Sequence, residues 1–135
     1  MQAIPTTGIA QGIKYLEKIK HDSLQGKSPV VICSLGDASV TEGEVSEAFQ
    51  FAALHQLPII YLVQDNDWGI SVTSKEARTC NAYEFIDGFK GINRVSLNGS
   101  HFIESYQTMQ KVIQEVRDNR IPYLVHAKVP LLGHH

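Results

Sequence analysis

Short apolar runs of strand length alternate along this chain with longer stretches in which apolar residues recur every three or four positions. Four runs are long enough for a buried strand. They are PVVICSL at residues 29–35, PIIYLVQ at 58–64, INRVSL at 92–97 and PYLVHAKV at 122–129. Because most of these runs are apolar at successive positions, they predict strands that are buried on both faces.

The stretches between the strands have helical periodicity. In residues 8–20, Ile9, Ile13, Leu16 and Ile19 fall on one face and the lysines lie elsewhere, which predicts an amphipathic helix. Further helices are expected at residues 42–56, where Pro58 ends the pattern, at 100–117 and, as a short piece, around Tyr83.

Strands that alternate with helices predict an α/β fold with a parallel sheet and helices on both faces. The sequence has no internal repeat and no linker that would divide it, so residues 1–135 are expected to form one domain. Ligands of such sheets bind beyond the carboxyl ends of the strands. The residues after the first two strands, at 36–37 and 64–66, are therefore the first candidates for a binding site.

Composition narrows the classes of function. Of 135 residues, 43% are hydrophobic and 19% charged, which suits a globular domain and excludes a disordered chain. No apolar run approaches the roughly 20 residues that cross a bilayer, and we expect a soluble, cytoplasmic protein. The net charge of -2, without blocks of like charge, favours neither nucleic acid nor a membrane as partner. Cys33 and Cys80 form neither a disulfide framework nor a zinc motif, and we expect inert thiols.

A carboxylate and an amide follow the first two strands. Asp37 and Asn66 are 29 positions apart, a distance filled by one helix and one strand, so their side chains can face each other at the sheet edge. Oxygen donors of this kind suit a hard cation such as magnesium, which usually accompanies phosphate. Gly36 would let the backbone approach that phosphate closely. An alternative remains open at this point: Asp37 and Ser39 cap a helix, and residues 65–67 form a turn.

The sequence around these residues resembles a known motif. Gly36-Asp37 with TEGEVSEAFQFAALHQLPII and Asp65-Asn66 resembles the thiamine-diphosphate motif, a Gly-Asp-Gly after one strand and an Asn-Asn after the next. More narrowly, EGEVSEAFQFAALHQLPIIYLVQDNDWGIS is similar to the α subunits of 2-oxoacid dehydrogenase decarboxylating components. The C-terminal YLVHAKVPLLGHH resembles the same family, and its Gly-His-His resembles the branched-chain members.

This resemblance implies the thiamine-diphosphate-binding fold and a set of site residues. Asp37 and Asn66 would bind Mg²⁺ through their side chains and Trp68 through its backbone carbonyl. The diphosphate of the cofactor would lie against Gly36, Ala38 and Ser39. His135 would be the catalytic residue, bonded to a phosphate or to the reacting intermediate, and His134 is the less favoured of the pair.

Three positions depart from the family pattern. Ala38 replaces the last glycine of Gly-Asp-Gly, and Asp65 replaces the first asparagine of Asn-Asn, which adds negative charge near an anionic cofactor. Gln64 stands at a cofactor-facing position where branched-chain members can carry an arginine. We therefore expect weaker or more metal-dependent binding than in the family.

The resemblance also implies a reaction and partners. The reaction is oxidative decarboxylation of a 2-oxoacid with acyl transfer to a lipoyl group, and a branched-chain substrate such as 3-methyl-2-oxobutanoate is favoured. The chain would be the diphosphate-binding domain, a fragment of a longer protein that is inactive alone. Its partners would be a β subunit or fused pyrimidine-binding domain, which supplies the missing glutamate, and the lipoyl domain of the acyltransferase, in a dimer or heterotetramer.

Other functions are kept as alternatives. The protein could act on pyruvate or acetoin within the same family, or could be similar to transketolase or acetolactate synthase. A different class, a non-catalytic cofactor-binding module, is compatible with Ala38, Asp65 and Gln64. Metal-dependent binding of thiamine diphosphate to the full-length protein separates these classes.

Overall fold

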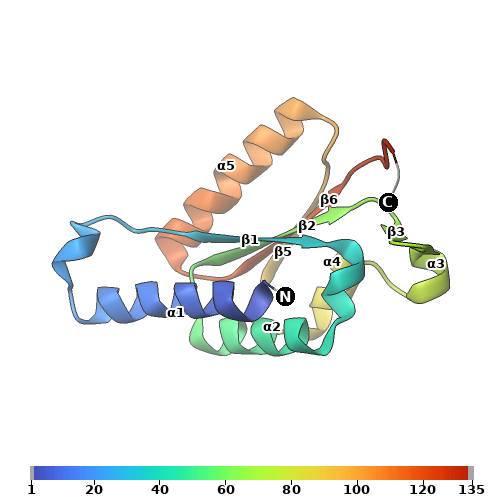
Figure 1. Ribbon diagram of the computed structural model, residues 1–135. Helices are drawn as coiled ribbons and strands as arrows, with labels where there is room; N and C mark the ends of the chain where they lie inside the picture. Colours follow the sequence, from blue (N-terminus) through green and yellow to red (C-terminus); the bar gives the residue numbers. More distant parts are fainter. Residues whose placement is uncertain (1, 134–135) are drawn as a thin grey trace.

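The computed structural model describes residues 2–133 and contains a four-stranded parallel sheet, with strands in the order β1-β2-β6-β5 (Figure 1). The strands are β1 (Val31–Gly36), β2 (Ile59–Asp65), β5 (Asn93–Asn98) and β6 (Tyr123–Lys128). All four predicted strands are confirmed, because each lies within two residues of its expected bounds. A small antiparallel hairpin, β3 (Trp68–Gly69) and β4 (Val72–Thr73), follows β2.

Helices cover both faces of this sheet, as the pattern predicted (Figure 1). The α-helices are α1 (Ala3–Lys18), α2 (Gly43–His55), α3 (Ser74–Ala77), α4 (Ala82–Phe85) and α5 (Phe102–Asn119). Three 3-10 turns, η1 (Asp22–Leu24), η2 (Asp37–Thr41) and η3 (Ile86–Gly88), complete the chain's elements within residues 2–133. Helices α1 and α2 lie together against one face, and α5 crosses the other (Figure 1).

Alternate residues of β2 therefore enter two separate cores. Tyr61 and its neighbours at alternate positions pack with α1 and α2, whereas Ile60 packs with Val112 and Val116 of α5. Tyr61 is fully buried, and its ring meets Phe49 edge to face at 4.7 Å between centroids. Successive residues of a strand point to opposite faces, so a strand between two helical layers must be apolar throughout.

The buried face of α1 differs from the one that its sequence suggested. The residues in contact with the core are Ala3, Thr7 and Ala10, whereas Ile9 and Ile19 are 59% and 48% exposed. Small side chains let α1 approach the sheet and α2 closely, and the Thr7 hydroxyl lies 2.7 Å from the Tyr61 hydroxyl. The isoleucine stripe is thus turned away from this core.

Strand β1 forms one edge of the sheet and is covered on one face only by the described residues. Cys33 and Leu35 are buried against α1 and α2, but Ile32, which points to the other face, is 47% exposed. Helix α5 packs mainly against β5 and β2. The second face of β1 is therefore open around Ile32 and Ser34.

Candidate functional site

Strands β1 and β2 end side by side. Gly36 is aligned with Gln64 in the ladder, and the chain then enters η2 from β1 and a two-residue loop from β2. Asp37 and Asn66 therefore leave the sheet at the same edge, as the topology of a parallel sheet requires. Their sharing of one cation stays a prediction.

The carboxylate of Asp37 is buried and paired with an arginine. Asp37 is 3% exposed, and its Oδ2 accepts a hydrogen bond from Nη2 of Arg78. Neither η2 nor α2 has a side-chain cap, and the Ser39 hydroxyl donates instead to the Gly36 carbonyl at 2.7 Å. The capping alternative is therefore wrong for Asp37 and Ser39.

The loop after β2 does form the turn that the alternative proposed. The amide of Asp67 donates to Oδ1 of Asp65 at 3.0 Å, and the amide of Trp68 donates to Oδ1 of Asn66 at 3.0 Å. Asp67 adopts a φ of 65°, which a short polar residue tolerates in such turns. An amide oxygen has two lone pairs, so the turn does not by itself decide whether Asn66 coordinates a cation.

Asp65 belongs to a buried polar chain that the sequence analysis missed. Its Oδ2 lies 2.6 Å from Nε2 of His126, and Nδ1 of His126 lies 3.0 Å from the Ser96 hydroxyl. Asp65 and His126 are 4% and 2% exposed. Burial raises the pKa of Asp65, but the hydrogen bonds from His126 and the Asp67 amide outweigh burial and leave that pKa below its usual value. The extra carboxylate at position 65 therefore has its own partner within the protein.

The two loops at this edge touch through the smallest side chains. A Cβ added to Gly69 would lie 2.8 Å from the Cβ of Ala38, closer than two carbons can approach. The methyl group that replaces a glycine hydrogen at position 38 is thus accommodated by the missing side chain at position 69. Around Gly36, by contrast, an added Cβ would meet nothing within 4 Å, so the backbone there is open to a ligand.

Two hollows flank these loops, and their charges differ. One, of about 630 Å³, lies between α1, the end of β1 and the start of α2, and it contains Glu42 and Glu44 but no lysine or arginine. The other, of about 160 Å³, lies beside α3 and includes Lys75 and Arg78 together with three acidic residues, Asp65, Asp67 and Glu84. An anion at this edge would therefore find cationic side chains only on the α3 side, or positive charge in a metal ion.

The donors at this edge suit the predicted cation. A carboxylate, an amide oxygen and a backbone carbonyl are hard oxygen ligands of the type that Mg²⁺ takes. Within residues 2–133 no group of three His, Cys, Asp or Glu side chains is placed to hold a metal ion. A cation would thus depend on the amide of Asn66 and the carbonyl of Trp68 as well as on Asp37.

Not every predicted residue reaches this edge. Oε1 of Gln64 accepts a hydrogen bond from the Ser34 hydroxyl at 2.8 Å, so its side chain lies along the open face of β1 and not beside Asp37. His135 and His134 lie outside the described residues. Arg78 and His126 are the site residues that were not predicted.

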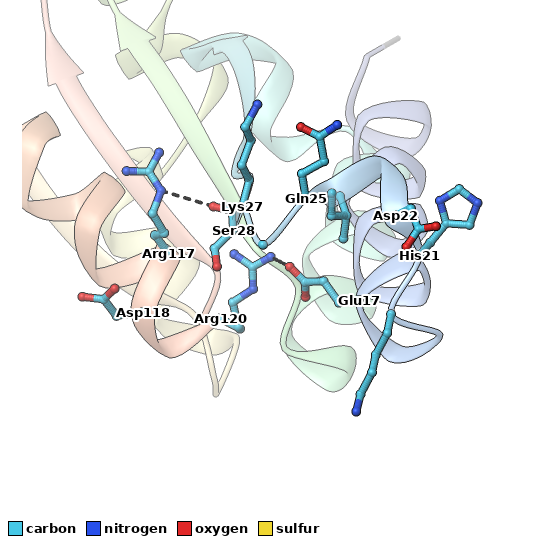
Figure 2. Close-up of a pocket in the computed structure, with 12 residues that line it drawn as sticks. Glu17, His21, Asp22, Gln25, Lys27, Ser28, Arg117, Asp118 and Arg120 are labelled. Atoms are coloured by element: carbon cyan, nitrogen blue, oxygen red, sulfur yellow. Dashed lines mark hydrogen bonds and ion pairs between the residues drawn. The ribbon is translucent and has the colours of Figure 1, made fainter.

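A larger pocket, of about 770 Å³, lies at the opposite edge, where the strands begin (Figure 2). Arg120 pairs with Glu17 and donates to the Pro29 carbonyl at 3.0 Å, and Arg117 donates to the Ser28 carbonyl at 3.2 Å. These contacts fasten the loop before β1 to α5. Because both arginines are bonded to the protein, we assign this pocket a structural role.

No helix within residues 2–133 is long and apolar enough to cross a membrane.

Comparison with known proteins agrees with this architecture. Among solved structures, a transketolase from Campylobacter jejuni is similar, with a TM-score of 0.64 and 22% identity over 91% of this chain and 20% of its own. This likeness confirms the predicted fold.

Curated relatives are more similar in sequence. The pyruvate dehydrogenase E1 component subunit alpha of Rickettsia prowazekii (strain Madrid E) is 31% identical over 89% of this chain and 35% of its own length. The 3-methyl-2-oxobutanoate dehydrogenase subunit alpha of Mycobacterium tuberculosis (strain ATCC 25618 / H37Rv) is 32% identical over 78% and 29%. This chain spans about a third of these relatives. The profile of the family "Dehydrogenase E1 component" matches residues 1–135, and the chain therefore belongs to that family.

Proposed function

We propose that this chain is the diphosphate-binding domain of a thiamine-diphosphate-dependent 2-oxoacid dehydrogenase. The observation that carries the proposal is the buried carboxylate of Asp37 at the carboxyl end of β1, next to the loop with Asn66 after β2. In the structure the Arg78 guanidinium neutralises this buried carboxylate, so a metal ion that binds Asp37 has to take the place of that guanidinium. The position of Asp37 at the ligand-binding edge of a parallel sheet supports a role in binding.

In this proposal, Mg²⁺ is held by the side chains of Asp37 and Asn66 and by the carbonyl of Trp68. The diphosphate lies against the backbone at residues 36–39, where the surroundings of Gly36 are open. Thiamine diphosphate, when bound, supplies the electron sink that decarboxylation of a 2-oxoacid needs. This chain anchors and orients the cofactor, and His135 provides a hydrogen bond near the reacting groups.

The non-catalytic alternative rested on three departures from the family pattern, and the structure weakens two of its arguments. Ala38 is accommodated by Gly69, so the methyl group need not obstruct a phosphate. The carboxylate of Asp65 has hydrogen-bond partners of its own in His126 and the Asp67 amide. The third departure stands, because Gln64 is bonded to Ser34 and does not supply the contact to the cofactor that an arginine at this position would make. We therefore favour a binding-competent domain of an enzyme.

For the substrate, we propose a branched-chain 2-oxoacid such as 3-methyl-2-oxobutanoate, on the basis of the Gly-His-His at the C-terminus. Relatives named for pyruvate and for 3-methyl-2-oxobutanoate are 31% and 32% identical, so identity does not choose between them. The acyl group would pass to a lipoyl domain, and a β subunit or fused pyrimidine-binding domain would complete the site. Turnover of the two oxoacids by the full-length protein with its partner decides the preference.

The test of cofactor binding is a calorimetric titration of thiamine diphosphate into the full-length protein, with and without Mg²⁺. We expect saturable binding that requires the metal and at least a tenfold loss of affinity in Asp37→Asn, because the carboxylate is the only charged ligand proposed. Asp22→Asn is the matched control, since Asp22 is exposed in η1 at the other end of the domain.

Two results would contradict the proposal. One is equal affinity of the wild type and Asp37→Asn for the cofactor in the presence of Mg²⁺. The other is the absence of metal-dependent binding to a wild-type protein that melts cooperatively. Either result would return the chain to the class of non-catalytic modules.

A further inference from the structure

Arg78 is held firmly at the proposed cofactor edge. It follows α3, its amide donates to the Ser74 carbonyl at 2.9 Å, and the Ser74 amide donates to the Asp67 carbonyl at 2.9 Å. A capping box between Thr73 and Glu76 fixes the start of the same helix. The guanidinium is therefore carried by a short element that is tied directly to the loop containing Asn66.

The side chain of Arg78 is buried but incompletely satisfied. It is 9% exposed, its Nη2 pairs with Asp37, and its Nε has no hydrogen-bond partner among residues 2–133. A guanidinium has five N–H donors and cannot lose its charge, so a buried donor without an acceptor is costly. The missing partner must be an acceptor, and planar guanidinium groups prefer the paired oxygens of carboxylates and phosphates.

Arg78 is paired with the Asp37 carboxylate, which is also the proposed ligand of the divalent cation. A divalent ion bound to Asp37 would lie close to the Arg78 guanidinium. The two positive charges would repel each other, and burial of the site strengthens this repulsion. The ion and Arg78 therefore cannot both pair closely with Asp37. If the ion arrives with a diphosphate, the released guanidinium gains acceptor oxygens for Nε and Nη2.

We propose that Arg78 and the divalent cation compete for Asp37, and that the released Arg78 donates hydrogen bonds to the diphosphate. The second half of this inference rests on the proposed function, whereas the competition concerns the metal alone. The cation by itself then binds weakly because it must displace Arg78. Cation and diphosphate bind with positive coupling, since the displaced arginine becomes a ligand of the anion.

The experiment uses the full-length protein, Mn²⁺ as the metal probe and inorganic pyrophosphate as the anion probe. In Arg78→Met, we expect Mn²⁺ alone to bind about tenfold more tightly than in the wild type, and pyrophosphate at saturating Mn²⁺ about tenfold more weakly. In Arg78→Lys, which keeps the charge but lacks the planar fork, the affinity for Mn²⁺ alone stays near wild type and pyrophosphate binds more weakly. Lys27→Met, at an exposed position near the opposite edge of the sheet, is the control and changes neither affinity appreciably.

A double-mutant cycle of unfolding, made without ligand, checks the pairing even if Arg78→Met is poorly folded. The destabilisation caused by Arg78→Met should be smaller in an Asp37→Asn background, because no buried carboxylate is then left alone. Additive effects of the two substitutions would overturn the pairing.

The binding results separate this inference from the proposed function. Unchanged or weaker binding of Mn²⁺ alone in Arg78→Met, together with normal binding in the wild type, overturns the competition and leaves the cofactor site intact. Unchanged binding of pyrophosphate overturns the second step. A wild-type protein that binds neither Mn²⁺ nor pyrophosphate overturns both the inference and the proposed function.

Discussion

Single residues within this domain show how polar groups are satisfied in an apolar core. The Tyr61 hydroxyl lies 2.7 Å from the Thr7 hydroxyl and 3.2 Å from the Ala48 carbonyl, so its single hydrogen is shared between these two acceptors and joins β2 to α1 and α2. Thr7 in turn donates to the Ala3 carbonyl at 2.7 Å. Burial raises the pKa of Tyr61, so its phenol stays protonated in the folded chain at a pH where an exposed tyrosine ionises.

This arrangement predicts the effect of Tyr61→Phe. The variant should lose about 1–2 kcal/mol of unfolding free energy at neutral pH, because the Thr7 hydroxyl oxygen and the Ala48 carbonyl lose the donor that they share. Since the folded-state pKa is raised, the wild type gains its full stability below the unfolded pKa of about 10 and loses stability as the pH rises above it. The difference between wild type and variant should therefore shrink from pH 9 to pH 11.

Urea unfolding at several pH values measures this difference. Tyr15→Phe is the control, because the Tyr15 side chain is 59% exposed and should tolerate the loss of its hydroxyl. An equally steep alkaline loss of stability in wild type and Tyr61→Phe would contradict the assignment of this titration to Tyr61.

At the scale of elements, the contact between η2 and β3 fixes the geometry of the proposed site. It depends on Gly69, whose added Cβ would lie 2.8 Å from that of Ala38. Gly69→Ala should destabilise the protein by about 1–3 kcal/mol, because one of the two loops must move. Ala38→Gly in the same chain should restore most of this loss, since it removes the atom that clashes.

Thermal or urea unfolding of the single and double variants tests this pair. Gly36→Ala serves as the control for stability, because an added methyl group there meets nothing within 4 Å. If Ala38→Gly leaves the cost of Gly69→Ala unchanged, the two loops do not touch in the way described.

Helices and strands were predictable where packing imposes a regular spacing of apolar residues along the sequence. The central strands β2 and β6 followed most directly from apolar runs, since a strand between two helical layers is apolar on both faces. The orientation of α1 was not predictable in this way, because alanines at positions 3 and 10 and Thr7 pack more closely than the isoleucine stripe. Close approach of helices depends on small residues, which carry no hydrophobic signal.

Site residues were predictable only where they come directly after a strand in the sequence. Asp37 and Asn66 could be placed from topology, but Arg78 lies in a mixed stretch without periodicity and meets Asp37 across 41 positions. His126 did leave a signal, since a titratable side chain inside an apolar run must find a buried partner. Identifying Asp65 as that partner required the register of β2 and β6.

At the scale of the whole molecule, α1 and α2 carry apolar side chains that the described residues leave uncovered. These exposed residues are Ile4, Ile9 and Tyr15 of α1, Ile19 directly after it, and Phe51 and Leu54 of α2. Leu54 is 78% exposed. Exposed large apolar side chains on two neighbouring helices are typical of an interface.

We therefore predict that a pyrimidine-binding domain or β subunit covers α1 and α2 in the intact enzyme. Leu54→Arg should weaken this association, because a charge would be buried without a partner, whereas Gln50→Arg on the same helix starts from an exposed polar residue and serves as control. Sedimentation of the full-length protein with its partner measures the effect. A strictly monomeric wild type, or equal masses for Leu54→Arg and wild type, would contradict this interface.

The strand order has a consequence for the time at which this domain can fold during synthesis. Strand β6 is translated last of the four but lies between β2 and β5, and every ladder that β5 makes is with β6. Until residue 128 has left the ribosome, β1 and β2 form an isolated pair and α5 has no complete sheet to cover. Apolar segments thus stay unpaired until β6 has emerged, which exposes them to non-native association during that interval.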